Sequence, residues 1–222
     1  MRRLLNSALI LLLPTFGLSQ INLEMQNLVH DVYKLAQSED KTHTIYTFWF
    51  PVDFWELSTA GHPQVAKEDL NRMKAALENY LLLAISEVDN SQGFLNYTLR
   101  DELQQKISVT NSNNQLLERI EIYDLPHDAY LAVRSFDATL EQLFGKLGRE
   151  LEFMVYDISQ CLELFDPRAP SGSFLIQVGE YDIEFTLPLG SFLPMKKCPL
   201  TNELYNGKWN YCPIHGQELI AQ

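Results

Sequence analysis

The spacing of apolar residues predicts helices in four segments of the chain. Residues 21–37 and 64–88 place apolar side chains mostly three or four positions apart, which is the pattern of an amphipathic helix. The second segment has the longest apolar stripe, and Pro63 before it suits the first turn of a helix. We expect this helix to cover a sheet. Shorter helices are predicted at residues 98–105 and 137–147.

Runs of β-forming residues between turn residues predict a mainly antiparallel sheet. The run at 151–158 is apolar on both faces, as in a central strand that is covered on both sides. Residues 173–178 and 181–187 alternate apolar and polar side chains about Gly179 and Glu180, which predicts a half-buried hairpin. Further strands are predicted at 44–50, 106–110, 116–125 and 129–136, with a hairpin turn at 111–114. The predicted fold class is therefore α+β, a mainly antiparallel sheet with packed helices and a small C-terminal module.

Five large aromatic rings lie within a stretch of eight residues that begins in the first strand pattern, namely Phe48, Trp49, Phe50, Phe54 and Trp55. Such rings offer a large contact area, so Trp49, Phe54 and Trp55 form a candidate aromatic surface for a sugar or a peptide. The alternative is that the rings fill the core from two faces of a sheet. We favour the core because no polar groups converge beside the rings in the sequence.

The first 19 residues have the order of a secretory signal peptide: Arg2 and Arg3, then a short apolar run, then small residues. About 12 apolar residues, at ~1.5 Å each in a helix, are too short to cross a ~30 Å bilayer core. We therefore expect cleavage after Ser19, a mature protein without a membrane span, and a secreted or periplasmic location. The expected divisions are a signal peptide at 1–19, an α+β domain at 20–193 and a C-terminal module at 194–222.

The charge of the chain excludes nucleic acid as a partner. The formal net charge is −12, and removal of the signal peptide makes it −14 because two arginines and no acids are lost. A nucleic-acid-binding protein needs a basic face to neutralise phosphates, and this composition does not supply one. The hydrophobic share of 46% and the charged share of 21% are those of an ordinary globular protein.

The C-terminal stretch KKCPLTNELYNGKWNYCPIHGQEL, residues 196–219, carries two of the three cysteines. Its segment CPIHG resembles the second knuckle of a zinc ribbon, usually Cys-Pro-x-Cys-Gly, and CPLTNEL resembles the first knuckle. The resemblance covers residues 198–219 and implies a small hairpin module in which Cys198, Cys212 and His215 bind zinc. We also expect Asn206-Gly207 to form a two-residue hairpin turn that brings the two sulfurs together.

The chain departs from the ribbon pattern at Thr201, where the first knuckle would supply a second ligand. A structural zinc site normally has four closed ligands, and only three are evident. The fourth would have to come from Glu203, Cys161, another histidine or water.

A disulfide between Cys198 and Cys212 is the main alternative to zinc. Export places the chain in an oxidising compartment, and a bridge closing about 15 residues would stabilise the fold by roughly 3 kcal/mol. That interpretation leaves His215 without a role. A third alternative is two free thiols in a degenerate ribbon that keeps only the shape. Cys161 is expected to be an inert buried thiol.

Two classes of function follow from these features. No nucleophile elbow, phosphate loop, dinucleotide fingerprint or His-Glu-x-x-His motif is present in the sequence. The favoured class is therefore a non-catalytic exported domain that binds a protein, a peptide or a glycan. The alternative is a hydrolase whose site is assembled from distant residues, with a metal held by the tail. Solvent-open rings at 48–55 would favour binding, whereas carboxylates meeting a histidine in a cleft would favour an enzyme.

Overall fold

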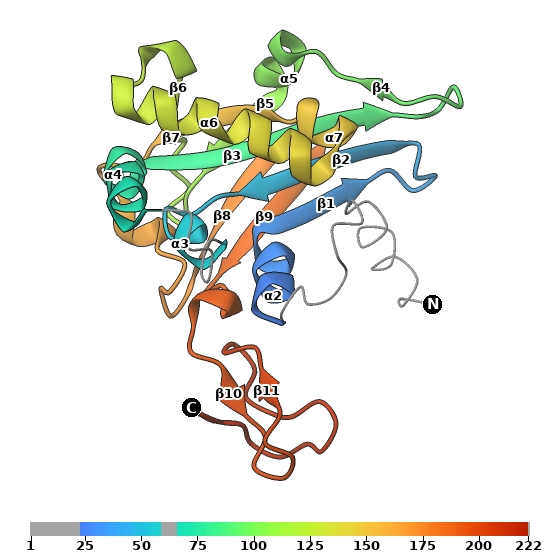
Figure 1. Cartoon of the computed structure of the whole chain (residues 1–222). Coiled ribbons are helices and arrows are strands. Elements are labelled where there is room, and N and C mark those ends of the chain that lie inside the picture. Colours follow the sequence, from blue (N-terminus) through green and yellow to red (C-terminus); the bar gives the residue numbers. More distant parts are fainter. Residues whose placement is uncertain (1–22, 59–65, 222) are drawn as a thin grey trace.

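The computed structural model describes residues 23–58 and 66–221, and its architecture is α+β (Figure 1). The helices are α2 (Leu23–Val32), α3 (Phe54–Ser58), α4 (Lys67–Leu77), α5 (Arg100–Lys106), α6 (His127–Phe144) and α7 (Lys146–Arg149), with 3-10 turns η1 (Ile122–Asp124), η2 (Leu162–Phe165) and η3 (Gly190–Phe192). The strands are β1 (Tyr33–Gln37), β2 (His43–Trp49), β3 (Tyr80–Asp89), β4 (Asn96–Tyr97), β5 (Ile107–Thr110), β6 (Arg119–Ile120), β7 (Glu152–Asp157), β8 (Gly172–Val178), β9 (Tyr181–Leu187), β10 (Lys196–Lys197), β11 (Leu204–Tyr205) and β12 (Ile220–Ala221).

Three antiparallel sheets organise the described chain. The largest has the strand order β1-β2-β3-β7-β6, with β4 paired to the end of β3. The second has the order β5-β8-β9, and the third, at the C-terminus, has the order β11-β10-β12. The C-terminal sheet projects from one end of the body formed by the first two sheets (Figure 1).

The central strand β3 separates two hydrophobic cores because its side chains alternate between the faces of the sheet. Leu81, Leu83 and Ile85 pack in the core shared with the second sheet. Leu82 and Ala84 point into the core that is closed by α6 and α4. Both faces are therefore covered, and β3 is buried along nearly its whole length. Hydrogen bonds to β2 on one side and β7 on the other complete its environment.

The helix predicted at 64–88 is wrong beyond Leu77. The described part of that segment forms α4, and the chain then turns into the ten-residue strand β3. The run from Leu81 to Ile85 is apolar at every position, so it satisfies a helical stripe and a doubly covered strand equally well. Strand partners on both sides, from distant segments, decide in favour of the strand.

The helix predicted at 21–37 ends early for a similar reason. Helix α2 stops at Val32, and the next five residues form the edge strand β1 against β2. In that register Tyr33 lies opposite Phe48, and their ring centroids are 4.9 Å apart. Pairing with a strong neighbouring strand therefore overrides the helical spacing of these few residues.

The strand predicted at 129–136 is helical and belongs to α6. Buried residues Ala129, Val133, Phe136 and Leu140 recur at intervals of three and four, which places them on one face toward the main sheet. The 18-residue helix begins after Pro126, ten residues before the predicted start at residue 137. The remaining predictions fare better: the strands at 44–50 and 151–158, the short helix within 98–105 and the hairpin of β8 and β9 are confirmed.

The turn at 111–114 is confirmed, but the strand predicted at 116–125 is mostly wrong, because only β6 is extended there and η1 follows it. The Asn111 amide donates to the Gln115 carbonyl, and a single bridge joins Thr110 to Leu116. Beyond this bridge the chain leaves β5 and adds β6 to β7 in the main sheet. The segment therefore links two sheets and does not form one long hairpin.

The aromatic segment is part of the core. Trp49 and Trp55 are buried, Phe54 is half-buried, and Phe48 and Phe50 are buried on the helix-covered side. Trp49 meets the second sheet, and the Trp55 ring stacks on Phe136 of α6. The candidate aromatic surface of Trp49, Phe54 and Trp55 is thus corrected. The pleat of β2 turns Trp49 into the core shared with the second sheet, whereas helix α3 carries Phe54 and Trp55 and buries Trp55 in the helix-covered core.

No helix in the part of the chain that the structure describes is long and apolar enough to cross a membrane. The signal peptide predicted at residues 1–19 lies outside the described residues.

Candidate metal centre

Two short turns in the C-terminal segment, residues 194–221, have the same backbone. The first follows Cys198 and the second follows Cys212. The amide of Asn202 donates to the Cys198 carbonyl at 2.9 Å, and the amide of Gly216 donates to the Cys212 carbonyl at 2.8 Å. Both Asn202 (φ 62°) and Gly216 (φ 64°) adopt the left-handed conformation, which asparagine and glycine tolerate best. We call these turns the first and second knuckle.

A second pair of bonds closes each knuckle in the same way. Cys198 N–H donates to the Glu203 carbonyl at 2.9 Å, and Cys212 N–H donates to the Gln217 carbonyl at 2.8 Å. The two knuckles therefore repeat one local structure, although their sequences share only the Cys-Pro dipeptide at the start. Together they form a repeated backbone turn beside a small three-stranded sheet.

Each sulfur is surrounded by donors from its own knuckle. The backbone amides two and three positions later hydrogen-bond to the sulfur in both turns: Leu200 and Thr201 to Cys198, Ile214 and His215 to Cys212. N–H donors stabilise the negative form of a sulfur, which is the form that binds metal. The short turn places these donors because a cysteine followed by proline opens a tight reversal.

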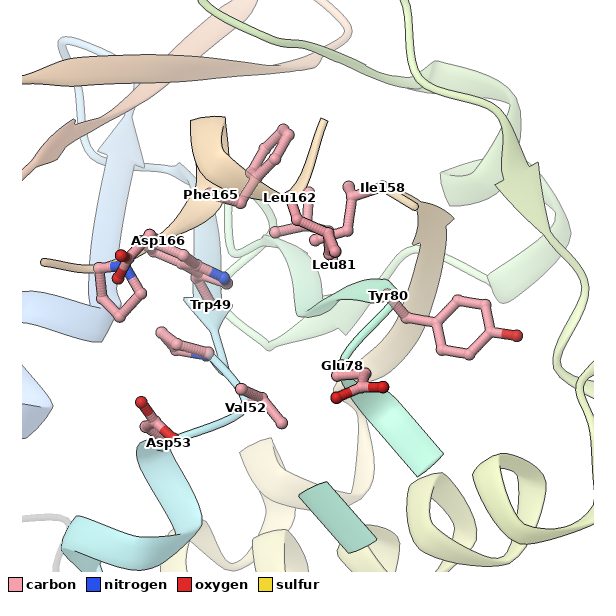
Figure 2. Close-up of a pocket in the computed structure, with 12 residues that line it drawn as sticks. Trp49, Val52, Asp53, Glu78, Tyr80, Leu81, Ile158, Leu162, Phe165 and Asp166 are labelled. Carbon is pink, nitrogen blue, oxygen red and sulfur yellow. The ribbon is translucent and has the colours of Figure 1, made fainter. Parts of the chain in front are cut away.

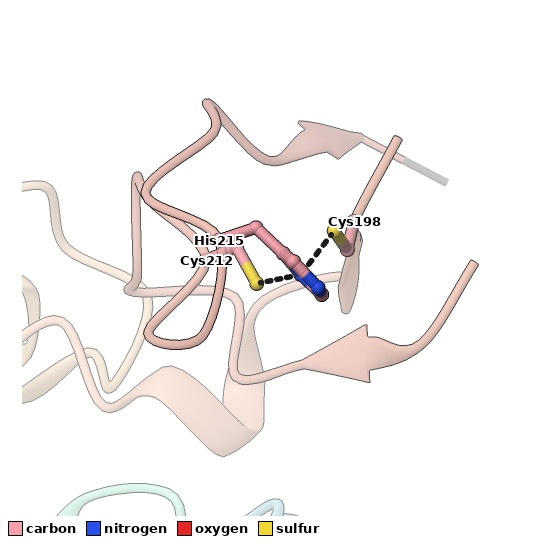
Figure 3. Close-up of side chains that lie close together, drawn as sticks. All are labelled: Cys198, Cys212 and His215. Atoms are coloured by element: carbon pink, nitrogen blue, oxygen red, sulfur yellow. Dashed lines mark hydrogen bonds between the residues drawn. The ribbon is translucent and has the colours of Figure 1, made fainter. Parts of the chain in front are cut away.

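The Cys198 and Cys212 sulfurs and the His215 imidazole converge on one point (Figure 3). His215 Nδ1 lies 3.6 Å from Cys198 Sγ and 3.4 Å from Cys212 Sγ. The ligand atoms of the three residues all lie within 4.8 Å of one another. Cys198 and Cys212 are buried and His215 is exposed. The group is consistent with a metal site, as the sequence predicts.

The electrostatics of the group favour thiolates. Burial raises the pKa of the Cys212 thiol, but bonds from the His215 amide and the Tyr205 hydroxyl outweigh it and lower the pKa to about 6. Burial also raises the pKa of the Cys198 thiol, but hydrogen bonds from the Leu200 and Thr201 amides outweigh burial and lower the pKa overall. The pKa of His215 is raised, first by Cys212 and then by Cys198. All three cysteines of the chain are free thiols in this structure.

The residues considered as a fourth ligand lie elsewhere or have other partners. Cys161 packs against the core shared by the two large sheets, and its thiol contacts Asn111. Among the described histidines, His43 pairs with Glu87, and none other than His215 joins the group. Glu203 is close in sequence, but its carboxylate is engaged by two hydroxyls.

The Asn206-Gly207 turn follows β11 and does not connect β10 to β11. The first knuckle makes that connection, and the Trp209 amide closes the Asn206 turn at 3.0 Å. Glycine is required at position 207, since a Cβ there would lie 2.5 Å from the Pro194 carbonyl oxygen and 2.6 Å from Cβ of Leu193, the last residue before the segment. The predicted role of this turn is therefore corrected: it seats the segment, while pairing of β10 with β11 and β12 brings the knuckles together.

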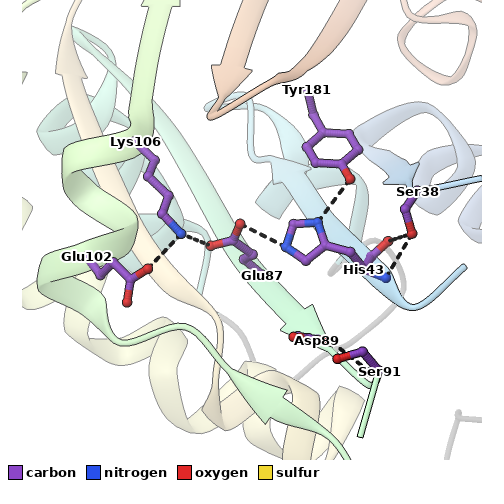
Figure 4. A network of polar contacts seen from close by, with 8 residues as sticks. All are labelled: Ser38, His43, Glu87, Asp89, Ser91, Glu102, Lys106 and Tyr181. Atoms are coloured by element: carbon purple, nitrogen blue, oxygen red, sulfur yellow. Dashed lines mark hydrogen bonds and ion pairs between the residues drawn. The ribbon is translucent and has the colours of Figure 1, made fainter.

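A second polar cluster joins the two large sheets (Figure 4). Glu87 of β3 is 5% exposed and contacts His43 Nε2 and Lys106 Nζ, each at 3.0 Å. The other ring nitrogen of His43 lies 3.1 Å from the hydroxyl of Tyr181 on β9. Burial raises the pKa of Glu87, but hydrogen bonds from Thr98 and Lys106, with the charges of Lys106 and His43, lower it overall. The cluster is a satisfied buried network between sheets.

The lowered pKa of Glu87 predicts a pH-dependent contribution to stability. Because the folded-state pKa lies below the ordinary value of 4.5, the contribution is present above that value and is lost as pH falls through the folded pKa. We expect Glu87→Gln to lower the free energy of unfolding by about 1–3 kcal/mol at neutral pH, since a charge-assisted pairing is lost. The gap to the wild type should shrink on acidification below 4.5. Urea unfolding of both proteins, from neutral pH to below 4.5, measures this difference in the free energy of unfolding.

The matched control for this prediction is Glu180→Gln, at an exposed turn between β8 and β9. It should leave the unfolding midpoint almost unchanged at every pH. A constant gap between Glu87→Gln and the wild type down to strongly acidic pH would contradict the assigned role of the Glu87 charge.

A cavity of about 190 Å³ lies where Trp49, the loop after β2 and η2 meet (Figure 2). Its lining is mainly apolar, with Asp53, Glu78 and Asp166 at the edge. Asp53 forms ion pairs with Lys74, at 2.6 Å, and with Arg168. No histidine or cysteine is among the described residues that line this cavity.

Comparison of the chain with protein-family models, with curated proteins and with solved structures found no match.

Proposed function

We propose that the protein is a non-catalytic zinc-binding interaction protein. Its C-terminal module holds one zinc through Cys198, Cys212 and His215. The observation that carries the proposal is the pair of equivalent knuckles, which aim two sulfurs and one imidazole at one point. A zinc ion binds sulfur and imidazole ligands in tetrahedral geometry, so this donor set suits it.

Zinc accounts for more of the site than a disulfide does. Each sulfur accepts N–H bonds from its own knuckle, and His215 Nδ1 lies within 3.6 Å of both sulfurs. A disulfide would neutralise both sulfurs and leave the imidazole without a partner. A metal uses all three side chains and needs both sulfurs in the anionic form that the amides favour.

The interaction surface we propose is the C-terminal module. Leu200, Trp209, Tyr211 and Ile214 are each between 47% and 69% exposed there, within one short segment. Exposed aromatic and aliphatic groups that gather on a small rigid unit suit a protein or peptide partner. The rings at 48–55 are buried, except for the half-buried Phe54, and do not support a glycan platform on the sheet. Export to a secreted or periplasmic location, which rests on the N-terminal pattern, belongs to the same proposal.

Metal analysis with thiol titration tests the proposed site. We expect purified mature protein to contain one zinc per chain, and the thiols of Cys198 and Cys212 to become reactive only when the protein is unfolded with a chelator. Cys161→Ser is the matched control, because Cys161 packs in the other part of the molecule and its loss should leave the zinc in place. Metal-free protein that shows one thiol before reduction and three after it would establish the disulfide instead.

A further inference from the structure

Thr201 lies where a complete ribbon would hold its fourth ligand. Position for position, the first knuckle places Thr201 where the second places His215, because each follows its cysteine by three residues in the same backbone turn. The Thr201 hydroxyl contacts Cys198 and donates to Glu203 Oε2 at 3.1 Å. A neutral hydroxyl is a poor zinc ligand beside two thiolates and an imidazole.

Glu203 does not replace the missing ligand. Its Oε2 atom accepts hydrogen bonds from Thr201 and from the Tyr205 hydroxyl, the latter at 2.8 Å. The Tyr205 hydroxyl also contacts the Cys212 sulfur. The carboxylate is thus held outside the group of three ligands by two hydroxyls that stand between it and the sulfurs. Among the described residues, the metal-ligating group contains only Cys198, Cys212 and His215.

Exposed residues occupy the last ligand position of each knuckle and the position before it. Thr201 and His215 are exposed, and the residue before each is strongly exposed: Leu200 at 63% and Ile214 at 69%. Leu200 and Ile214 occupy the same position in the two knuckles. Each knuckle therefore carries an exposed aliphatic residue directly before its last ligand position.

We propose that a zinc bound in this centre keeps one coordination position on the Thr201 side for a ligand from outside the chain, and that this ligand is an alkyl thiolate. The inference rests on the proposed zinc site. A thiolate fits because the metal already has two sulfur ligands and because its alkyl carbons can pack on Leu200 and Ile214. In this exchange a metal–sulfur bond forms, the thiol proton passes to solvent, and a coordinated water leaves. No bond within the chain breaks.

Cobalt substitution tests the zinc site and its open coordination position separately. Co²⁺ added to metal-free protein should produce thiolate-to-metal absorption, which reports Cys198 and Cys212 as ligands. Titration with 2-mercaptoethanol should then increase this absorption in a saturable manner and shift the visible bands. Ethanol, which has the same carbon length without sulfur, should cause no change. The absorption of Co²⁺ and 2-mercaptoethanol without protein is measured separately and subtracted.

Thr201→Cys is the control variant that fills the position within the chain. We expect its Co²⁺ form to show the stronger sulfur absorption without added thiol and no response to thiol. It should also bind zinc more tightly than the wild type, by about 10-fold or more, since one more protein ligand closes the site. Glu203→Ala should leave the wild-type cobalt spectrum and its thiol response in place.

The outcomes distinguish the two proposals. Thiolate absorption without any response to thiol would overturn the open position while leaving the zinc site intact. A lost cobalt spectrum in Glu203→Ala, or a spectrum that depends on protein concentration, would do the same, because the fourth ligand would then come from Glu203 or from a second copy. The absence of thiolate absorption in the wild type would overturn the zinc site itself.

Discussion

We expect Cys212→Ser to lower the affinity of the proposed site for zinc by more than about 100-fold and to unfold the C-terminal segment while the two-sheet body stays folded. Loss of an outer-shell partner alone costs about 10–100-fold in metal affinity, so loss of a direct ligand costs more. We expect the fold of the segment to depend on the metal, because its core consists only of Cys198, Cys212 and Leu219, with Tyr205 packed against them. Such a core is too small to hold three two-residue strands without a metal or a bridge.

Competition with a chromophoric chelator measures the affinity, and amide hydrogen exchange measures the folding. Protection at residues 196–221 should fall in the variant, whereas protection in β2, β3 and β7 should persist. Cys161→Ser should change neither quantity. Unchanged zinc content in Cys212→Ser would show that the zinc is held by other residues.

Trp49→Ala lowers the free energy of unfolding of the two-sheet body by about 3–5 kcal/mol. Trp49 is 1% exposed, and its ring meets Phe174 and Phe185 edge-on at centroid distances of 4.9 and 5.6 Å. The residue comes from β2 of the main sheet, while its two partners come from β8 and β9 of the second sheet. Its removal leaves a cavity at the point where the sheets join.

Urea unfolding followed by circular dichroism measures this loss. Trp209→Ala is the matched control, because it removes a tryptophan that is 47% exposed and lies outside both large cores. Its main transition should stay within about 0.5 kcal/mol of the wild type. A loss below about 1 kcal/mol in Trp49→Ala would mean that the second sheet does not depend on this contact.

The segments that could be predicted from the sequence are those with one consistent pattern. In the β8–β9 hairpin, the alternate residues Phe174, Ile176 and Val178 on β8, and Ile183, Phe185 and Leu187 on β9, are buried, and the strand residues between them are half-buried or exposed. A half-buried hairpin has one buried face, so a period of two appears directly in the residues. The same holds for the knuckles, whose turns depend on neighbouring residues alone.

The segments that were predicted wrongly are buried on more than one side or carry short repeats. The run Leu81 to Ile85 is apolar throughout because it is covered by a sheet on one face and helices on the other. Its residue types then do not discriminate helix from strand. In α6, the segment 129–136 reads as a strand only when it is taken apart from the residues on either side that continue its apolar face.

The candidate metal centre shows the same division. Cys198, Cys212 and His215 are recognisable by their spacing, because each knuckle is a local structure of a few residues. The positions of Tyr205 and Glu203 could not be predicted, since they depend on how β11 lies against β10 and on which hydroxyls reach the carboxylate. Local spacing therefore identifies ligands, while strand pairing determines their surroundings.

By itself, the amino-acid sequence determined the α+β class, the half-buried hairpin and the three side chains of the candidate metal centre, because each follows from residue patterns within short stretches of chain. Only the tertiary structure decided that residues 80–89 form the central strand, that Trp49 and Trp55 face inward, and that the Glu203 carboxylate pairs with Thr201 and Tyr205. These features depend on partners that are distant in sequence. Burial on both faces and pairing across the sheet select one structure from several that the local pattern permits.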